Sequence, residues 1–136
     1  MREKLSIVMV AIASFVLLGL FAQSAIAEDV SRVTKEELKT MMGESQVVVI
    51  DVRTGKDWDG SKLKIKDAVR EEPRKATSWA GKYNKQKTYV LYCAGANEAT
   101  SAGTALQMIK LGFTEVHALK GGWREWSDAE FPMTIK

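Results

Sequence analysis

The longest apolar run of the chain stands at its N-terminus, where residues 5–22 contain no charged side chain. Two basic residues, Arg2 and Lys4, precede this run, and the small-residue sequence Ala25-Ile-Ala27 follows it. A basic start, an apolar middle and an Ala-x-Ala end are the pattern of a secretory signal peptide. The pattern predicts that residues 1–27 are removed on export.

The same segment has a second interpretation as an uncleaved membrane anchor. Its length of 18 residues is at the short end of what spans a bilayer. The well-placed Ala-x-Ala sequence favours cleavage, and no cysteine lies beside it to carry a lipid. We therefore expect a periplasmic or secreted protein that begins at Glu28. It would touch a membrane only through the signal segment, if that segment were retained.

Residues 28–136 are enough for one small domain. The first predicted element is a helix that begins after Thr34, because Thr34 and Glu37 have the spacing of a capping box. Apolar residues follow at helical spacing, and Gly43 ends the predicted helix.

Three later segments are short, mainly apolar runs, typical of strands that are covered on both faces. They are residues 46–52, 87–92 and 114–119. Between and after them the pattern predicts helices at 76–83, 98–111 and 121–127, a helical turn at 55–59 and a short strand at 68–69. Strands that alternate with helices predict an α/β domain with a mostly parallel central sheet and helices on both faces.

The only cysteine of the chain, Cys93, stands at the end of the second long strand. The small residues Ala94 to Asn97 allow the backbone to curl before the next helix starts at Glu98. Backbone N–H groups of such a loop and helix start point toward the sulfur, where they bind an anion and favour thiolate over thiol. Because ligands of parallel sheets bind at the carboxyl ends of strands, we expect an accessible, reactive Cys93.

Composition excludes several other functions. Residues 28–136 carry 18 Lys and Arg against 16 Asp and Glu, with no basic patch among aromatic residues, so nucleic acid is not an expected partner. The single histidine, His117, lies on an apolar strand and is interpreted as a packed structural residue. One histidine and one cysteine make no convincing metal site, and we expect no cofactor.

Three motifs, taken in order, resemble those of the single-domain rhodaneses, which are sulfurtransferases. They are Asp51-Val-Arg53 after the first long strand, Tyr92-Cys93 before its loop and helix, and Leu119-Lys-Gly-Gly-Trp123-Arg-Glu-Trp126 near the end of the chain. The resemblance extends over about residues 34–132 and implies a rhodanese-like three-layer sandwich.

The resemblance implies a role for each matching residue. Cys93 is the nucleophile, which takes a sulfane sulfur from a small anionic donor or a persulfide, holds it as a persulfide and passes it to a thiophilic acceptor. The acceptor is cyanide or a thiol, including a thiol of another protein. Asp51 supports the loop, and Arg53 lies near the bound anion. The cradle that binds the persulfide comprises Ala94, Gly95, Ala96, Asn97, Glu98 and Ala99.

Two departures from the family pattern stand out. Many thiosulfate-using rhodaneses have Arg or Lys five residues after the cysteine, where this chain has Glu98. A carboxylate there is expected to repel the thiosulfate dianion, which favours a polysulfide or an organic persulfide as donor. The usual His-x-Pro-Gly-Ala stretch is replaced by Lys64-Ile-Lys-Asp-Ala68, which loses a histidine and a proline that are mostly structural in the family.

The residues leave alternatives open. The loop can belong to a non-catalytic module that binds an anion or a protein, or to a thiol redox protein that forms mixed disulfides, although the chain has no Cys-x-x-Cys. Cys93 can be a small buried apolar residue at a strand end. Glu98 can be an ordinary carboxylate in the first turn of a helix, favoured by the helix dipole.

Overall fold

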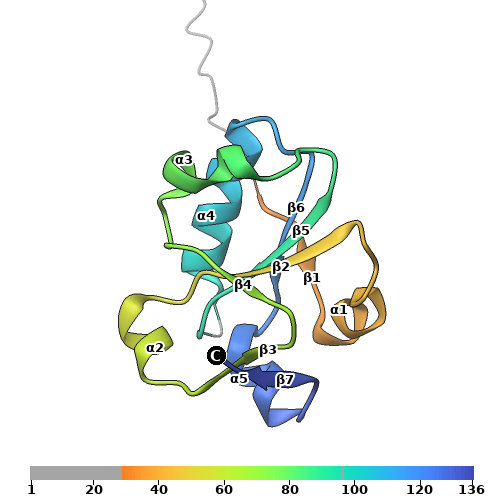
Figure 1. The fold of residues 1–136 in the computed structure, drawn as a ribbon, viewed down its shortest axis with the longest axis vertical. Helices are drawn as coiled ribbons and strands as arrows, with labels where there is room; N and C mark the ends of the chain where they lie inside the picture. The colour runs from red at the N-terminus through yellow and green to blue at the C-terminus, as the bar shows by residue number, and fades with distance from the viewer. Residues whose placement is uncertain (1–28, 96) are drawn as a thin grey trace, which may run out of the picture.

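The computed structural model describes residues 29–95 and 97–136 (Figure 1). The predicted signal peptide, residues 1–27, lies outside the described residues, as does Ala96 of the predicted cradle. Within the described ranges, no helix is both long and apolar enough to cross a membrane.

Five parallel strands form the central sheet in the order β1-β6-β5-β2-β4. These strands are β1 (Arg32–Val33), β2 (Val47–Asp51), β4 (Val69–Arg70), β5 (Thr88–Tyr92) and β6 (Glu115–Leu119). A second, antiparallel sheet pairs β3 (Leu63–Ile65) with β7 (Met133–Ile135). The α/β fold with a mostly parallel central sheet is therefore confirmed.

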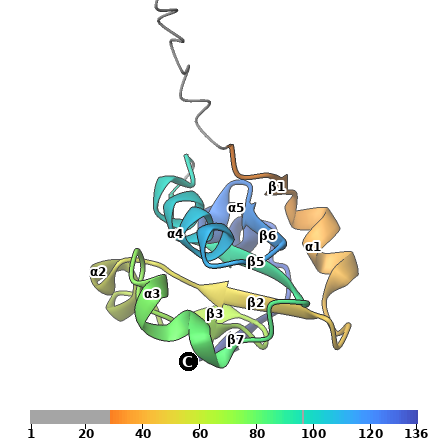
Figure 2. The same ribbon diagram turned by 90° about the horizontal axis from the view of Figure 1, so that it is seen from above.

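Helices cover both faces of the central sheet. The helices of the described residues are α1 (Lys35–Met41), α2 (Gly55–Asp59), α3 (Ala76–Trp79), the 3₁₀ turn Ala80–Lys82, α4 (Ala99–Lys110) and α5 (Gly122–Asp128), of which α2 lies at the carboxyl edge of the sheet (Figure 1). Figure 2 shows α1 on the side of the sheet opposite α3 and α4. One core lies between the sheet and α3 and α4, and a second lies between the sheet and α1 and α5.

The apolar run of β5 supplies both cores. Tyr89 and Leu91 pack into the core beside α4, while Val90 and Tyr92 pack into the core beside α1 and α5. Successive side chains of a strand point to opposite faces, so a strand that is covered on both sides needs apolar residues at successive positions. This requirement explains why the central strands could be recognised from their sequence.

The first helix begins as the capping box predicts. The Thr34 hydroxyl accepts a hydrogen bond from the Glu37 N–H at 3.2 Å, and the Glu37 carboxylate accepts one from the Thr34 N–H at 2.9 Å. The helix ends at Met41, slightly before Gly43, which takes a left-handed φ of +89°. A glycine adopts this conformation without a steric penalty.

The carboxyl ends of the central strands meet at one edge of the sheet. Asp51 at the end of β2 is paired in register with Tyr92 at the end of β5, and Cys93 follows directly. In Figure 1 this edge faces the lower end of the molecule, where α2, α5 and the small β3–β7 sheet also lie. This arrangement confirms that Cys93 stands at the carboxyl edge.

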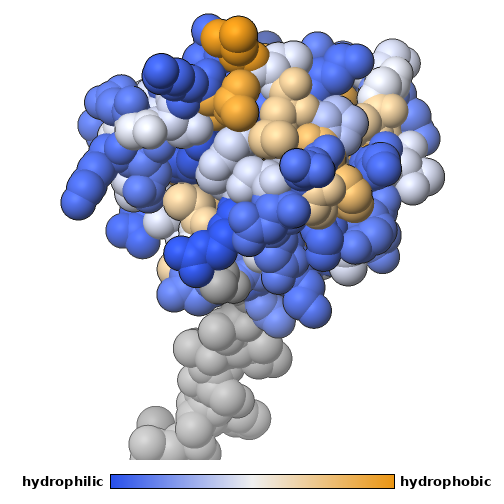
Figure 3. Space-filling view, turned by 90° about the horizontal axis from the view of Figure 1, so that it is seen from below, coloured by the Kyte–Doolittle hydropathy of each residue, from blue (hydrophilic) through white to orange (hydrophobic). Residues whose placement is uncertain are grey.

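The small sheet contributes much of the exposed apolar surface. Figure 3, the view from below, shows apolar residues gathered on part of a mostly hydrophilic face. The exposed large apolar side chains among the described residues are Leu63, Val69 and Ile135. Leu63 and Ile135 are cross-strand partners in the β3–β7 pair.

Candidate active site

Cys93 is buried at the carboxyl end of β5, with 5% of the residue exposed. Its Sγ lies 3.4 Å from the Oγ of Ser101, in the first turns of α4. The expectation of an accessible thiol is therefore wrong for this conformation. The sulfur points toward α4. The start of α5 packs against the Cys93 carbonyl.

Of the predicted cradle, Ala94, Gly95, Asn97 and Glu98 lie in the connection between β5 and α4, and Ala99 is the first residue of α4. Ala94 and Gly95 are half-buried, while Asn97 is exposed and its Oδ1 accepts a hydrogen bond from the Ala99 N–H at 3.2 Å. Glu98 is the N-cap of α4 and has a left-handed φ of +53°. The binding of a persulfide by N–H groups of this loop stays a prediction.

The Glu98 side chain is buried and paired with an arginine. Its carboxylate lies 3.5 Å from the Nε of Arg32 on β1, and only 8% of the side chain is exposed. The expected repulsion of a donor assumed a free carboxylate facing the pocket. An ion pair with a neighbouring strand opposes that repulsion, because the arginine offsets the charge.

Asp51 and Arg53 form a buried ion pair at the end of β2. The Nη2 of Arg53 lies 2.7 Å from the Asp51 carboxylate, and the Nε lies 3.0 Å from it. The backbone N–H of Arg53 donates to the same carboxylate at 3.0 Å. The exposed fractions of the two side chains are 1% for Arg53 and 0% for Asp51. A buried charge needs this density of partners, because leaving water is costly.

Tyr92 extends this network from β5. Its hydroxyl donates to the Asp51 carboxylate at 2.6 Å and accepts from the Ile65 N–H of β3 at 3.1 Å. Burial raises the pKa of Tyr92, and the Asp51 carboxylate raises it further. The phenol therefore remains a protonated donor and joins β5, β2 and β3 just before Cys93.

Aromatic rings surround the Arg53 guanidinium. Its central carbon lies 4.7 Å from the ring centroid of Trp123, 5.3 Å from that of Trp58 and 5.6 Å from that of Tyr92. Two of its nitrogens face Asp51, and the third, Nη1, is buried and has no hydrogen-bond partner among the described residues. The guanidinium is therefore enclosed in this structure, and a contact of Arg53 with a bound anion stays a prediction.

The start of α5 contacts the backbone of the Cys93 loop. The Trp123 N–H donates to the Cys93 carbonyl at 2.8 Å, and the Trp123 ring stacks on Tyr92. Gly122 has a φ of +54°, and a Cβ placed there would lie 2.3 Å from the Cys93 carbonyl oxygen. No side chain fits at that distance, so glycine is required for α5 to approach the loop this closely.

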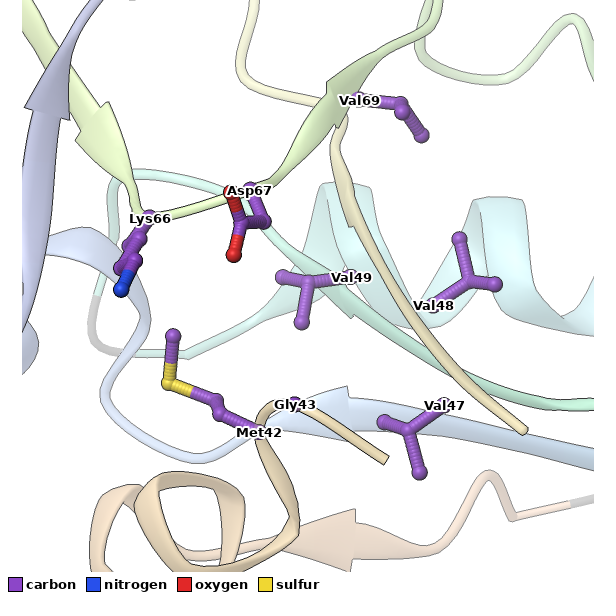
Figure 4. A pocket seen from close by; sticks show the side chains of 8 residues that line it. All are labelled: Met42, Gly43, Val47, Val48, Val49, Lys66, Asp67 and Val69. Carbon is purple, nitrogen blue, oxygen red and sulfur yellow. The ribbon is translucent and has the colours of Figure 1, made fainter. Parts of the chain in front are cut away.

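A cavity of about 250 Å³ lies elsewhere, at the opposite end of β2. Figure 4 shows its lining, which includes Met42, Val47, Val49 and Asp67. Val47 is paired with Thr88, at the start of the strand that ends before Cys93. At a rise of about 3.3 Å per residue, this pairing puts Val47 roughly 16 Å from the cysteine along the sheet, and Val49, paired with Val90, roughly 10 Å from it. The cavity is therefore separate from the candidate active site.

No three His, Cys, Asp or Glu side chains in the described ranges lie close enough together to hold a metal ion. His117 is partly buried and hydrogen-bonds to Ser31 and Glu115 on the β1–β6 side of the sheet. This placement agrees with its interpretation as a structural residue.

Sequence reasoning missed four contributors to the site: Arg32, Tyr92 as a hydrogen-bond donor, Ser101 and Gly122. The Gly121-Gly122 pair was visible in the sequence and signalled a tight approach. The contact of Arg32 joins segments far apart in the chain, and that of Ser101 depends on how the loop after Cys93 turns back toward the strand, so no simple sequence pattern predicts either contact.

The geometry defines an α/β domain that presents a loop with a thiol between a parallel strand and a helix. A scan against protein-family models matches residues 34–129 to the rhodanese-like domain. The chain therefore belongs to the rhodanese-like domain family, as its motifs indicated. A search of curated proteins found no match.

Solved structures have the same fold at low sequence identity. A full-length protein from Lactobacillus plantarum has a TM-score of 0.69 at 22% identity, with 77% of this chain and 88% of that chain covered. The rhodanese-like domain of an Anabaena protein has a TM-score of 0.64 at 20% identity, with coverages of 77% and 79%. A Rhodopseudomonas palustris protein, described as a possible tyrosine phosphatase, has a TM-score of 0.64 at 24% identity, with coverages of 79% and 85%.

Replacement of Tyr92 by phenylalanine tests the network beneath the loop. Tyr92→Phe leaves the buried Ile65 N–H without its acceptor and is expected to lower the free energy of unfolding by about 1–3 kcal/mol. Tyr89→Phe is the matched control, because its hydroxyl bonds only the Asn84 carbonyl, at 2.6 Å. Urea denaturation of both variants measures the difference. If both variants lose the same free energy of unfolding, the Tyr92 hydroxyl stabilises the protein no more than the Tyr89 hydroxyl does.

The same variant has an expected pH signature. The raised pKa of Tyr92 keeps the folded phenol protonated while the unfolded chain ionises near pH 10. The wild type therefore loses stability as the pH rises above about 10, and Tyr92→Phe lacks this part of the loss. Denaturation curves at several alkaline pH values check the sign.

Proposed function

We propose that the protein is an exported sulfurtransferase that carries sulfane sulfur on Cys93. The observation that supports this best is the position of the only cysteine at the junction of β5 and α4 in a rhodanese-like domain. We expect the N–H groups of the loop and of the first turn of the helix to point toward the sulfur, which would favour an anionic sulfur atom there.

The chemistry proceeds in two displacements. The Cys93 thiolate attacks the outer sulfur of a donor, the donor's S–S bond breaks, and the remainder leaves with the bonding electron pair, as sulfite does from thiosulfate. Cys93 then carries a persulfide. A thiolate or cyanide attacks the outer sulfur of the persulfide, the new S–S bond breaks, and the Cys93 thiolate is restored. Preorganised N–H donors of the loop stabilise charge on the outer sulfur.

Thiosulfate becomes a more plausible donor than the sequence indicated. The negative charge of Glu98 is paired with Arg32. We therefore keep thiosulfate, polysulfides and organic persulfides as the donor class, and a small-molecule or protein thiol as the acceptor.

Burial of Cys93 favours a second candidate, a non-catalytic module that binds an anion or a partner protein. A thiol with only 5% of its residue exposed reacts only if the loop opens. Phosphate ester hydrolysis is less well supported. The phosphatase class related to the rhodaneses has a loop one residue longer than the stretch from Cys93 to residue 98. That difference supports sulfur transfer over phosphatase activity.

Mass spectrometry of the intact protein separates sulfur transfer from the binding module. After exposure to thiosulfate, a polysulfide or glutathione persulfide, the wild type should gain the mass of one sulfur atom, removable by cyanide. Cys93→Ser should gain none while keeping the wild-type circular dichroism spectrum. A wild type that stays unmodified by all three donors would leave the binding module as the better description.

A double-mutant cycle tests whether Arg32 neutralises the Glu98 carboxylate. Arg32→Gln frees the carboxylate, so the KM for thiosulfate should rise by up to about tenfold, the size of a 1.4 kcal/mol effect. Glu98→Gln should change KM little, and the double variant should return to the wild-type value. If Glu98→Gln alone lowers KM strongly, the carboxylate faces the donor after all. Glu98→Arg is not expected to help, because it would bury a second cation beside Arg32.

Export rests on the first 27 residues, which contain the basic start, apolar run and Ala-x-Ala site. N-terminal sequencing of the protein produced with its leader in a bacterial host should begin at Glu28. A membrane-bound product that retains Arg2 and Lys4 would establish the anchor interpretation instead.

A further inference from the structure

Ser101 is the side chain that hydrogen-bonds the sulfur of Cys93 in the described structure. It is fully buried in the first turn of α4. Its Oγ lies 3.4 Å from the Cys93 Sγ and 3.1 Å from the Glu98 carbonyl oxygen. A buried hydroxyl with a sulfur on one side and a carbonyl on the other has two partners for its single hydrogen.

The direction of these hydrogen bonds depends on the charge of the sulfur. With a thiol, the S–H of Cys93 donates to the Ser101 oxygen, and the Ser101 O–H donates to the Glu98 carbonyl. A thiolate has no hydrogen to give and can only accept. When the proton leaves to water, the Ser101 O–H can turn from the carbonyl to the sulfur.

This rotation leaves no buried group without a partner. The Glu98 carbonyl also accepts the helical hydrogen bond from the Ala102 N–H, at 2.8 Å. The carbonyl therefore keeps one donor after the hydroxyl has turned. An unmet buried acceptor would oppose the rotation, and here that cost is absent.

We propose that the Ser101 hydroxyl donates a hydrogen bond to the Cys93 thiolate and thereby favours the charged, nucleophilic form of the sulfur. Little water reaches Cys93, which is 5% exposed, so a protein donor must replace the hydrogen bonds that water would give. The inference deepens the proposed function and rests on it, because sulfur transfer starts from the thiolate.

The other charged groups around Cys93 do not take the place of this donor, because each of them is paired with an opposite charge or exposed. Glu98 is paired with Arg32, Asp51 with Arg53, and Glu125 at the start of α5 with Lys35. The remaining charged groups of the β6–α5 corner, Lys120 and Arg124, are exposed. The dipole of α4 also favours the thiolate, but it is the same in wild type and in a Ser101 variant.

The test measures ionisation of the thiol directly. Ultraviolet absorbance of the thiolate is recorded against pH for the wild type, Ser101→Ala and Thr100→Ala, each corrected with the matching Cys93→Ala protein. Thr100 is the neighbouring helical residue and is partly exposed, so Thr100→Ala controls for loss of a hydroxyl in the same turn. A hydrogen bond to a charged group corresponds to about one pH unit or more.

The midpoint of Ser101→Ala should therefore lie about one pH unit above those of the wild type and Thr100→Ala. Ser101→Thr, which retains the hydroxyl, should restore the wild-type midpoint, provided that its thermal unfolding shows a folded protein. Equal midpoints for the wild type and Ser101→Ala would overturn the proposal.

The pH dependence of the Cys93 alkylation rate gives an independent readout. Its midpoint should lie about one pH unit higher in Ser101→Ala than in the wild type and in Thr100→Ala, and equal midpoints in all three proteins would count against the proposal. These measurements use no sulfur donor. A shifted midpoint in a protein that never forms a persulfide would refute sulfur transfer and keep the Ser101 assignment. Persulfide formation with equal midpoints would support sulfur transfer and refute the Ser101 assignment.

Discussion

The buried ion pair of Asp51 and Arg53 is the interaction on which the carboxyl edge of the sheet depends. The arginine also donates to the Leu63 carbonyl of β3 at 3.0 Å, and the aspartate accepts from Tyr92 of β5. The pair thus ties together the main sheet, the small sheet and the strand that leads to Cys93. Its charges are stable without water because nearly every donor and acceptor is occupied.

The architecture could be predicted from the sequence as far as local patterns define it. The runs that became β2, β5 and β6 must be apolar at successive positions because both faces are covered, and the α1 capping box is encoded by Thr34 and Glu37 alone. The short strands β1, β3 and β7 escaped prediction. Lys64 interrupts β3 with a polar residue, and its partner strand lies near the other end of the chain.

The site could be predicted in its location but only partly in its contacts. Cys93 was placed correctly, because a strand, a small-residue loop and a helix follow one another in the sequence. The burial of Cys93 was expected only as an alternative interpretation, and the partner that neutralises Glu98 was not foreseen. Arg32 reaches Glu98 only because β1 lies beside β6 at the edge of the sheet. Charge interactions between distant segments have no signature in either segment alone.

Gly122 restricts the sequence changes that two segments far apart in the chain can accept. Its missing side chain leaves the space that the Cys93 carbonyl fills, and its φ of +54° belongs to a conformation that other residues adopt with strain. Any single substitution at this position adds atoms where the loop already lies. The thiol loop and the start of α5 can therefore diverge only together, through paired changes, while the exposed positions of the surrounding helices remain free to vary one residue at a time.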